Sequence, residues 1–198
     1  MAERRARVDM LVATLAIAVS LAALFVSVLE VNVMRAEVRL MRAQERAAVW
    51  PYLDLGISYD SDGFSIEVAN KGVGPALIKH VAVTDARGQG FTGWPSILDA
   101  LLPANHGLTW SNYLTSGLAG TVLSPQEEVR AFRFPANGAN NAGGWTDTAQ
   151  TLASGMEGLT WQVCYCSVLD DCWIRRRAEE PQPTAAACAE VTQTAFEN

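Results

Sequence analysis

An uncharged apolar run near the N-terminus constrains this chain more than any other feature. Residues 10–29 read MLVATLAIAVSLAALFVSVL, with no charge, proline or glycine. A helix of this length is about 30 Å long, which is the thickness of the hydrocarbon core of a bilayer. The sequence therefore predicts a transmembrane helix over residues 10–29. A basic flank over residues 1–9, with Arg4, Arg5 and Arg7, precedes it.

The apolar run has two other interpretations. Ser20-Leu21-Ala22 resembles the small-residue cleavage site of a secretory signal peptide. The apolar run continues past this point to Leu29, which favours an anchor that is not cleaved. A buried helix of a soluble protein rarely extends so far without one charged residue.

Residues 30–49 predict a helical neck next to the membrane, because they contain good helix formers and neither proline nor glycine. Pro51 is expected to end this helix. Val31, Met34, Val38 and Met41 follow one another at spacings of three and four residues. The same register, extended back into the transmembrane run, places Leu24 and Ile17 on this apolar stripe. Such a stripe is typical of a helix that associates with a second copy or with a partner's helix. A solvated helix with a few apolar residues is the alternative.

Downstream of the neck the hydrophobic period changes from 3.6 to 2. Leu53, Leu55, Ile57 and Tyr59 alternate with polar residues, which predicts a half-buried strand. Further strands are expected over residues 64–68, 76–84, 129–134, 160–168 and 172–176, and short helices over residues 96–102 and 146–154. Short antiparallel strands separated by turns predict a mainly β fold, a sandwich with short helical inserts, over residues 50–198.

Two short motifs carry a resemblance. Residues 70–76 (NKGVGPA) and 123–128 (LSPQEE) each lead into an expected strand. They resemble turns of immunoglobulin-like adhesion and binding modules of bacterial envelope proteins. An N-terminal anchor followed by such a domain is similar to uncharacterised bacterial single-pass membrane-anchored proteins. The resemblance implies an immunoglobulin-like antiparallel sandwich at the bacterial inner membrane, and it transfers no catalytic residue.

An insert over residues 86–126 is unusually neutral for a long connection. It contains the aromatic residues Phe91, Trp94, Trp110 and Tyr113. Long loops often carry function, and aromatic residues are favoured at protein and bilayer interfaces. These four residues are therefore candidate contacts for a partner. Alternatively, the insert folds over one end of the sandwich and buries its own aromatic side chains.

The four cysteines all lie near the C-terminus, and three of them belong to an expected hairpin over residues 160–177. Cys164 and Cys166 would share one face of a strand. Cys166 and Cys172 could meet across the hairpin, which would leave Cys164 for Cys188, although four cysteines allow three pairings. The intervals between the cysteines do not match the C-x2–4-C pairs typical of zinc ligands. The Cys164-Tyr165-Cys166 pair also lacks the C-x-x-C motif at a helix start that is typical of redox sites. Disulfides would place the domain outside the cytoplasm, in the periplasm. Because arginines flank the apolar run on both sides, a cytoplasmic domain remains the alternative.

The charge balance and the motifs limit the possible functions. With 15 Lys and Arg against 21 Asp and Glu, the chain lacks the basic excess of a nucleic-acid binder. Residues 88–93 (GQGFTG) formally match the dinucleotide motif G-x-G-x-x-G, but Trp94-Pro95 intervenes before any expected helix, so a glycine-rich turn is favoured there. No P-loop, H-E-x-x-H or G-x-S-x-G motif is present, and no cofactor is expected. We expect a membrane-anchored, non-enzymatic protein, either a protein-interaction module or an accessory subunit of a membrane complex. A ligand-sensing envelope module that signals through the neck helix is the alternative, and an enzyme with an unrecognised site is the third hypothesis.

Overall fold

The computed structural model describes residues 2–102, 113–136, 144–184, 188 and 196. The chain divides into two compact units, Met1–Ala47 and Ala48–Asn198. The second unit is called the β domain below. Each unit is described by itself.

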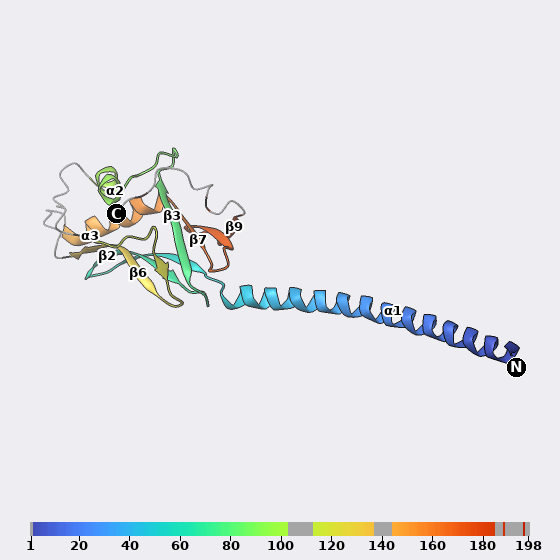
Figure 1. Ribbon diagram of the computed structural model, residues 1–198. Coiled ribbons are helices and arrows are strands. Elements are labelled where there is room, and N and C mark those ends of the chain that lie inside the picture. Colours follow the sequence, from blue (N-terminus) through green and yellow to red (C-terminus); the bar gives the residue numbers. More distant parts are fainter. Residues whose placement is uncertain (1, 103–112, 137–143, 185–187, 189–195, 197–198) are drawn as a thin grey trace. The chain divides into compact units, whose positions relative to one another are not determined.

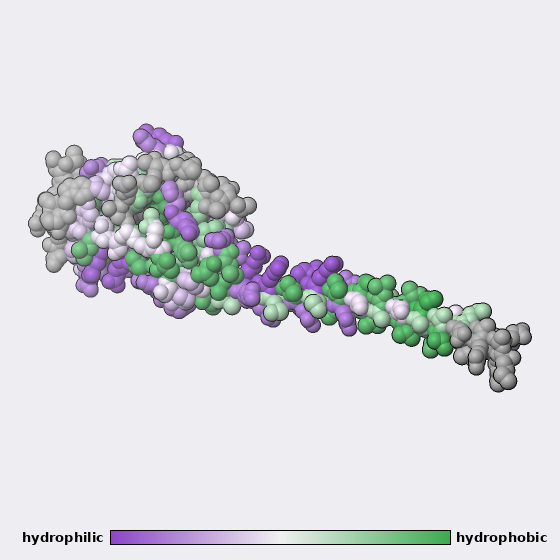
Figure 2. Space-filling view, in the orientation of Figure 1, coloured by the Kyte–Doolittle hydropathy of each residue, from purple (hydrophilic) through white to green (hydrophobic). Residues whose placement is uncertain are grey.

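The first unit is one helix, α1, which runs without interruption from Ala2 to Ala48. By length and composition α1 could cross a membrane, since its most apolar window has a mean hydropathy of 2.6 and is not buried in the protein. Figure 2 shows the apolar part of α1 in green, followed by a part in which purple, hydrophilic side chains prevail. The expected transmembrane segment and neck therefore form a single helix. It ends before Pro51, which cannot donate a helical hydrogen bond.

The β domain contains two antiparallel sheets (Figure 1). In spatial order the first sheet consists of β1 (Leu53–Tyr59), β2 (Gly63–Asn70), β6 (Glu128–Pro135) and β4 (Leu114–Thr115). The second consists of β5 (Val122–Leu123), β3 (Ala76–Thr84), β7 (Thr160–Cys166), β8 (Cys172–Arg176) and β9 (Gln182–Thr184). The expectation of a mainly β fold behind an N-terminal apolar helix is confirmed.

Both sheets contribute side chains to one core, as their alternating patterns require. Phe64 on β2 and Phe132 on β6 are fully buried in it, together with Val163 on β7. Two helices add to the same core: α2 (Trp94–Leu101) through Ile97, and α3 (Gly144–Glu157) through Leu152. The sequence pattern located both helices and six of the strands to within a few residues. Three strands of two or three residues, β4, β5 and β9, were not expected.

Candidate functional site

The aromatic residues of the insert do not form an exposed surface. Trp94 is 1% exposed, and its ring packs against Phe132, Trp161 and Phe196 at centroid distances of 4.7, 5.6 and 5.1 Å. Trp94 is therefore unavailable to a partner, because its ring fills the core. For this residue the alternative holds, in which the insert buries its own aromatic side chain.

The other three candidates of the insert differ from one another. Phe91 and Tyr113 are partly buried and pack against the core, with the ring of Tyr113 5.3 Å from that of Phe132. Burial raises the pKa of the Tyr113 hydroxyl above its ordinary value. Trp110 lies outside the described residues. The insert thus offers at most the exposed edges of Phe91 and Tyr113 among the side chains that the structure describes.

Exposed apolar side chains gather elsewhere, at the end of the sheets where β1 begins. Among the described residues of the β domain, seven large hydrophobic side chains are exposed, and five of them lie at this end. They form what we call the entry surface: Trp50, Val73, Val122, Val168 and Leu169. Their exposed fractions run from 45% to 61%. The two others are Tyr59, at the opposite end of β1, and Leu114 on β4.

Strand pairing and backbone hydrogen bonds place these five residues at the same end of the domain. The N–H of Val73 donates to the carbonyl of Trp50 at 3.0 Å. Leu77, at the start of β3, pairs with Val122 on one side and with Cys166 on the other. Because the β2–β3 loop and the β7–β8 hairpin extend from these paired positions, their side chains share one end of the domain.

Asn70 ties the loops at this end together. Its side chain is fully buried, and its Oδ1 accepts hydrogen bonds from the N–H groups of Tyr52 (3.2 Å) and Gly72 (3.0 Å). Its Nδ2 donates to three carbonyl oxygens, those of Gly74, Leu123 and Ser124, at 2.8 to 3.2 Å. One amide thus joins the start of β1, the β2–β3 loop and the turn after β5. The sequence singled out this stretch as a turn and gave no sign that the asparagine was buried.

Close packing also fixes the β2–β3 loop. A Cβ atom added at Gly72 would lie 2.4 Å from the backbone nitrogen of Tyr52, and one at Gly74 would lie 2.0 Å from the carbonyl oxygen of Val49. Backbone atoms cannot give way to a side chain, so both positions require glycine. The loop that carries Val73 is therefore held against the segment that carries Trp50.

The hairpin that carries Val168 and Leu169 is closed by a disulfide between Cys166 and Cys172, which face each other in the β7–β8 register. Inside the turn, the N–H of Leu169 donates to the hydroxyl of the buried Ser167. Strand β7 therefore ends at Cys166, two residues before the end expected from the apolar pattern. The apolar residues that follow belong to an exposed turn.

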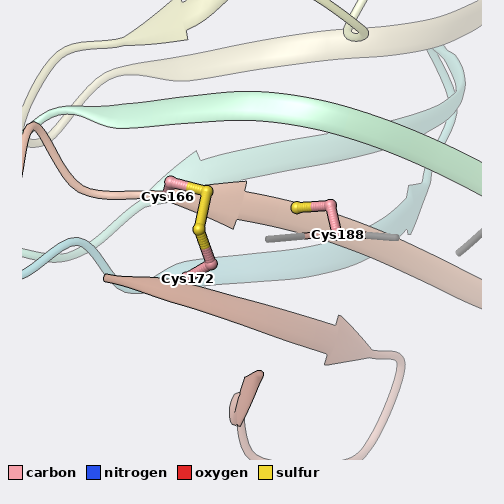
Figure 3. A group of neighbouring side chains, drawn as sticks. All are labelled: Cys166, Cys172 and Cys188. Atoms are coloured by element: carbon pink, nitrogen blue, oxygen red, sulfur yellow. A yellow bond between two sulfur atoms is a disulfide. The ribbon is translucent and has the colours of Figure 1, made fainter. Parts of the chain in front are cut away.

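The second disulfide joins Cys164 to Cys188. Cys164 and Cys166 share the outer face of β7, where Ala82, Ile174 and Cys188 form a small second cluster with them. The sulfur atoms of Cys166, Cys172 and Cys188 lie within 4.8 Å of one another (Figure 3). Since these three cysteines are all in disulfides, none offers a thiolate to a metal ion.

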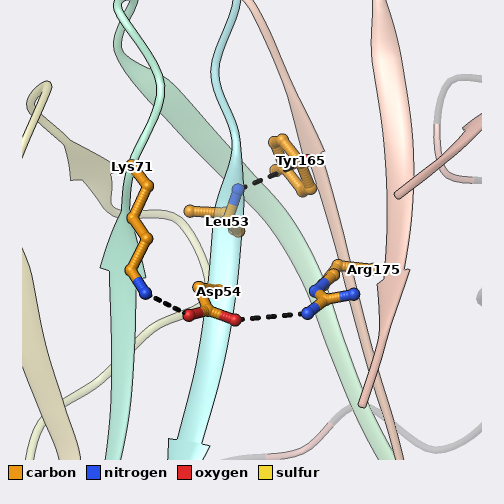
Figure 4. Close-up of polar contacts among 5 residues, drawn as sticks. All are labelled: Leu53, Asp54, Lys71, Tyr165 and Arg175. Atoms are coloured by element: carbon orange, nitrogen blue, oxygen red, sulfur yellow. Dashed lines mark hydrogen bonds and ion pairs between the residues drawn. The ribbon is translucent and has the colours of Figure 1, made fainter. Parts of the chain in front are cut away.

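An ionic network joins the two sheets beside the start of β1 (Figure 4). The carboxylate of Asp54 accepts a hydrogen bond from Lys71 and one from Arg175 on β8, the latter at 3.2 Å. The hydrogen bond from Lys71, together with the charges of both cations, holds the pKa of Asp54 below its ordinary value. Next to this pair, the N–H of Leu53 donates to the hydroxyl of Tyr165 at 3.5 Å.

The basic cluster at the end of β8 is neutralised in the same way. Arg175 is buried against Asp54, Arg176 lies 3.5 Å from Glu179, and Arg177 lies 3.6 Å from Glu157. The contacts of Arg175 and Arg177 connect this end of β8 to β1 and α3, whereas that of Arg176 is local to the following turn. The three arginines therefore each have an acidic neighbour and do not form an unpaired basic patch for an anionic partner.

The rim of the entry surface is acidic. Glu127 precedes β6 and Glu128 is its first residue, and Asp170 and Asp171 lie in the β7–β8 hairpin, whereas Lys71 is a basic residue in the adjoining loop. Residues 47–198 as a whole carry 8 basic and 16 acidic side chains. An apolar centre with an acidic rim is complementary to an apolar patch that has lysine or arginine around it.

The association stripe of α1 is exposed along its whole length. Its members are Ile17 (61%), Leu24 (63%), Val31 (46%), Met34 (61%), Val38 (41%) and Met41 (59%). Nothing in the described part of the chain covers these side chains. No protein-family model, curated protein or solved structure matches the chain.

Proposed function

We propose that the chain is a single-pass membrane protein whose β domain is an immunoglobulin-like sandwich. The apolar helix supports the anchor, because it is long enough to span a bilayer. The order β1-β2-β6-β4 matches the A-B-E-D sheet of that fold, and the inner strands β3-β7-β8 of the second sheet match C-F-G, with the short β5 and β9 added at its edges. The two disulfides support a domain outside the cytoplasm, in the periplasm of a bacterial inner-membrane protein.

The β domain then binds another protein and catalyses no reaction, as an interaction module or an accessory subunit of a membrane complex. The entry surface carries this proposal, since five of the seven exposed large apolar side chains described for the domain gather there. Exposed apolar patches with a polar rim mark interaction sites. The acidic rim disfavours an anionic lipid surface and favours a protein whose apolar patch has basic neighbours.

Site-specific photo-crosslinking in native membranes tests the proposal. A photoreactive amino acid replaces Leu169 or Val73 in the full-length chain, and the products are identified by mass spectrometry. We expect the same second protein to be captured from both positions. Tyr59 is the control, because it is comparably exposed but lies at the far end of β1. Capture of the same protein at equal yield from Tyr59, or no capture from either test position, contradicts the proposal.

A recess between the sheets favours the second candidate, a ligand-sensing module. Its volume for a water-sized sphere is about 20 Å³, room for about one water molecule, and its lining includes Leu55, Ile57, Val163 and Arg177. A small apolar molecule would suit these apolar walls only if the two sheets moved apart to admit it. Methyl NMR of the full-length chain in detergent, titrated with short-chain alcohols and fatty acids, tests this role. Saturable shifts confined to Ile66 and Val81 would support it, and the absence of shifts would oppose it.

A further inference from the structure

The exposed stripe of α1 contains a two-heptad pattern beyond the apolar run. If Val31 and Val38 are placed at heptad position a, Met34 and Met41 fall at position d. β-branched residues at a favour two-stranded coiled coils. Glu45 takes the next a position and ends the apolar seam. All four apolar side chains are exposed, with Val38 the least so at 41%.

The positions on either side of this seam carry opposite charges. Glu30 and Glu37 occupy position g, and Arg35 and Arg42 occupy position e. In a parallel pair of helices, position g of one chain faces position e of the other, five residues further along. Each glutamate then meets an arginine: Glu30 meets Arg35, and Glu37 meets Arg42. In an antiparallel pair, glutamates would face glutamates and arginines would face arginines.

These glutamates have no basic partner within their own helix. Side chains on a helix meet at spacings of three and four residues. The neighbours of Glu37 at those spacings are all apolar: Val33, Met34, Leu40 and Met41. The neighbours of Glu30 are Val26, Ser27, Val33 and Met34. In the described part of the chain no ion pair involves either glutamate, or Arg35 or Arg42.

The same register continues into the apolar part of α1. Ile17 and Leu24 fall at position a, and Ser20 and Ser27 at position d. The hydroxyl of Ser20 donates to the carbonyl of Ala16 at 2.8 Å, so its hydrogen bond is made within the helix. Small residues at one position of the seam let two helices approach closely in a membrane.

We propose that a second copy of this chain packs on this face of α1, parallel and in register. The charge pattern identifies the occupant, because the sequence is complementary to itself only in that arrangement. The inference rests on α1 and does not depend on what the β domain binds. An assembly of this kind carries two β domains, so a bivalent partner would be held by two entry surfaces.

A charge-swap cycle in the full-length chain tests this assembly. Dimerisation is measured by single-molecule photobleaching in lipid nanodiscs over a range of protein densities. E37R places arginine opposite Arg42 of the second copy, and we expect roughly tenfold weaker dimerisation as two symmetric attractions become repulsions. The double variant E37R/R42E should restore the dimer to within about threefold of the unmodified chain. R39E reverses a charge at position b, outside the seam; because the new carboxylate would lie one helical turn from Arg35 and Arg42 of its own helix, we expect a loss smaller than that in E37R.

The inference is overturned if the unmodified chain is monomeric. It is also overturned if R39E weakens dimerisation as much as E37R does, or if the double variant does not restore the dimer. Capture of a different protein's helix by a photoreactive group at Val38, with no capture of a second copy, also overturns it. These results are separate from crosslinking at Leu169 and Val73. Either proposal can therefore fail while the other stands.

Discussion

Asp54 on β1 and Arg175 on β8 connect the two sheets of the β domain through one ion pair, with 3.2 Å between Oδ1 and Nη2. The Arg175 side chain is 10% exposed, whereas Asp54 is 34% exposed and also meets Lys71. The pair thus lies at the boundary between core and solvent. A guanidinium in that place depends on its carboxylate, because burial of an unpaired charge is costly.

Removal of the carboxylate should therefore destabilise the domain. We expect Asp54→Ala to lower the free energy of unfolding by about 1–3 kcal/mol, since Arg175 loses its partner while it stays buried. Lys71→Ala should have a smaller effect, because its amine is exposed and its pair with Asp54 is screened by water. Urea unfolding of the full-length chain in detergent measures both. An equal loss in the two variants would show that the buried arginine does not depend on Asp54.

The same carboxylate predicts a dependence of stability on acid. The pKa of Asp54 in the folded protein lies below the ordinary value of 3.8, chiefly through its hydrogen bond with Lys71. The stabilisation is therefore present above about pH 4 and is lost as the pH falls through the lowered pKa. Asp54→Asn should flatten the fall in stability below about pH 4. A slope unchanged by the substitution would assign the acid sensitivity to other carboxylates.

At alkaline pH the relevant group is Tyr165. Burial raises its pKa from an ordinary value of 10.0 to about 12, against the opposing effect of the hydrogen bond from Leu53. Because the folded pKa is the higher one, stability is complete below about pH 10 and is lost as the pH rises towards 12. Thermal unfolding of Tyr165→Phe between pH 9 and 12 should lack most of this loss. Tyr59→Phe, with its exposed hydroxyl, is the matched control.

Among the polar residues that hold the loops of the entry surface in place, Asn70 should be the one whose replacement lowers the free energy of unfolding most. Asn70→Ala removes five hydrogen bonds and leaves backbone groups of three segments without a partner, so we expect a loss of about 2–4 kcal/mol. Asn70→Asp keeps the acceptor for Tyr52 and Gly72 but turns a carboxylate towards three carbonyl oxygens, and should be no better. Gln182→Ala, at an exposed amide on β9, is the control and should change stability by less than about 0.5 kcal/mol. A loss in Asn70→Ala no larger than in this control would contradict the role of Asn70.

The two disulfides should contribute unequally. Cys164 and Cys188 close a loop with a sequence separation of 24, against 6 for Cys166 and Cys172. Loop-closure entropy then predicts that replacement of Cys164 and Cys188 by serine lowers the free energy of unfolding by about 3 kcal/mol. Replacement of Cys166 and Cys172 by serine should lower it by about 2 kcal/mol. Chemical denaturation of both double variants measures these losses, and equal losses in the two would contradict the prediction.

Local patterns explain why much of the fold could be predicted. The alternation of apolar and polar residues predicted β1, β2 and β3, because each of these strands has one face in the core. The absence of proline and glycine predicted α1. The sequence offered the burial of Trp94 as one of two alternatives but could not identify its neighbours, since its ring packs on Phe196, about a hundred residues further along the chain. The entry surface was missed for a similar reason: Val168 continues the apolar run of β7 in the sequence but follows the strand end in space.

Leu53 and Phe196 belong to the same core, although nearly the whole β domain separates them in the chain. This arrangement sets an order of events during synthesis. At about 5–20 residues per second, a ribosome needs about 7–30 s to pass from the first of these residues to the second. The apolar segment of α1 has left the ribosome long before the core can close. A membrane therefore has time to take up the helix while the β domain is still unfolded.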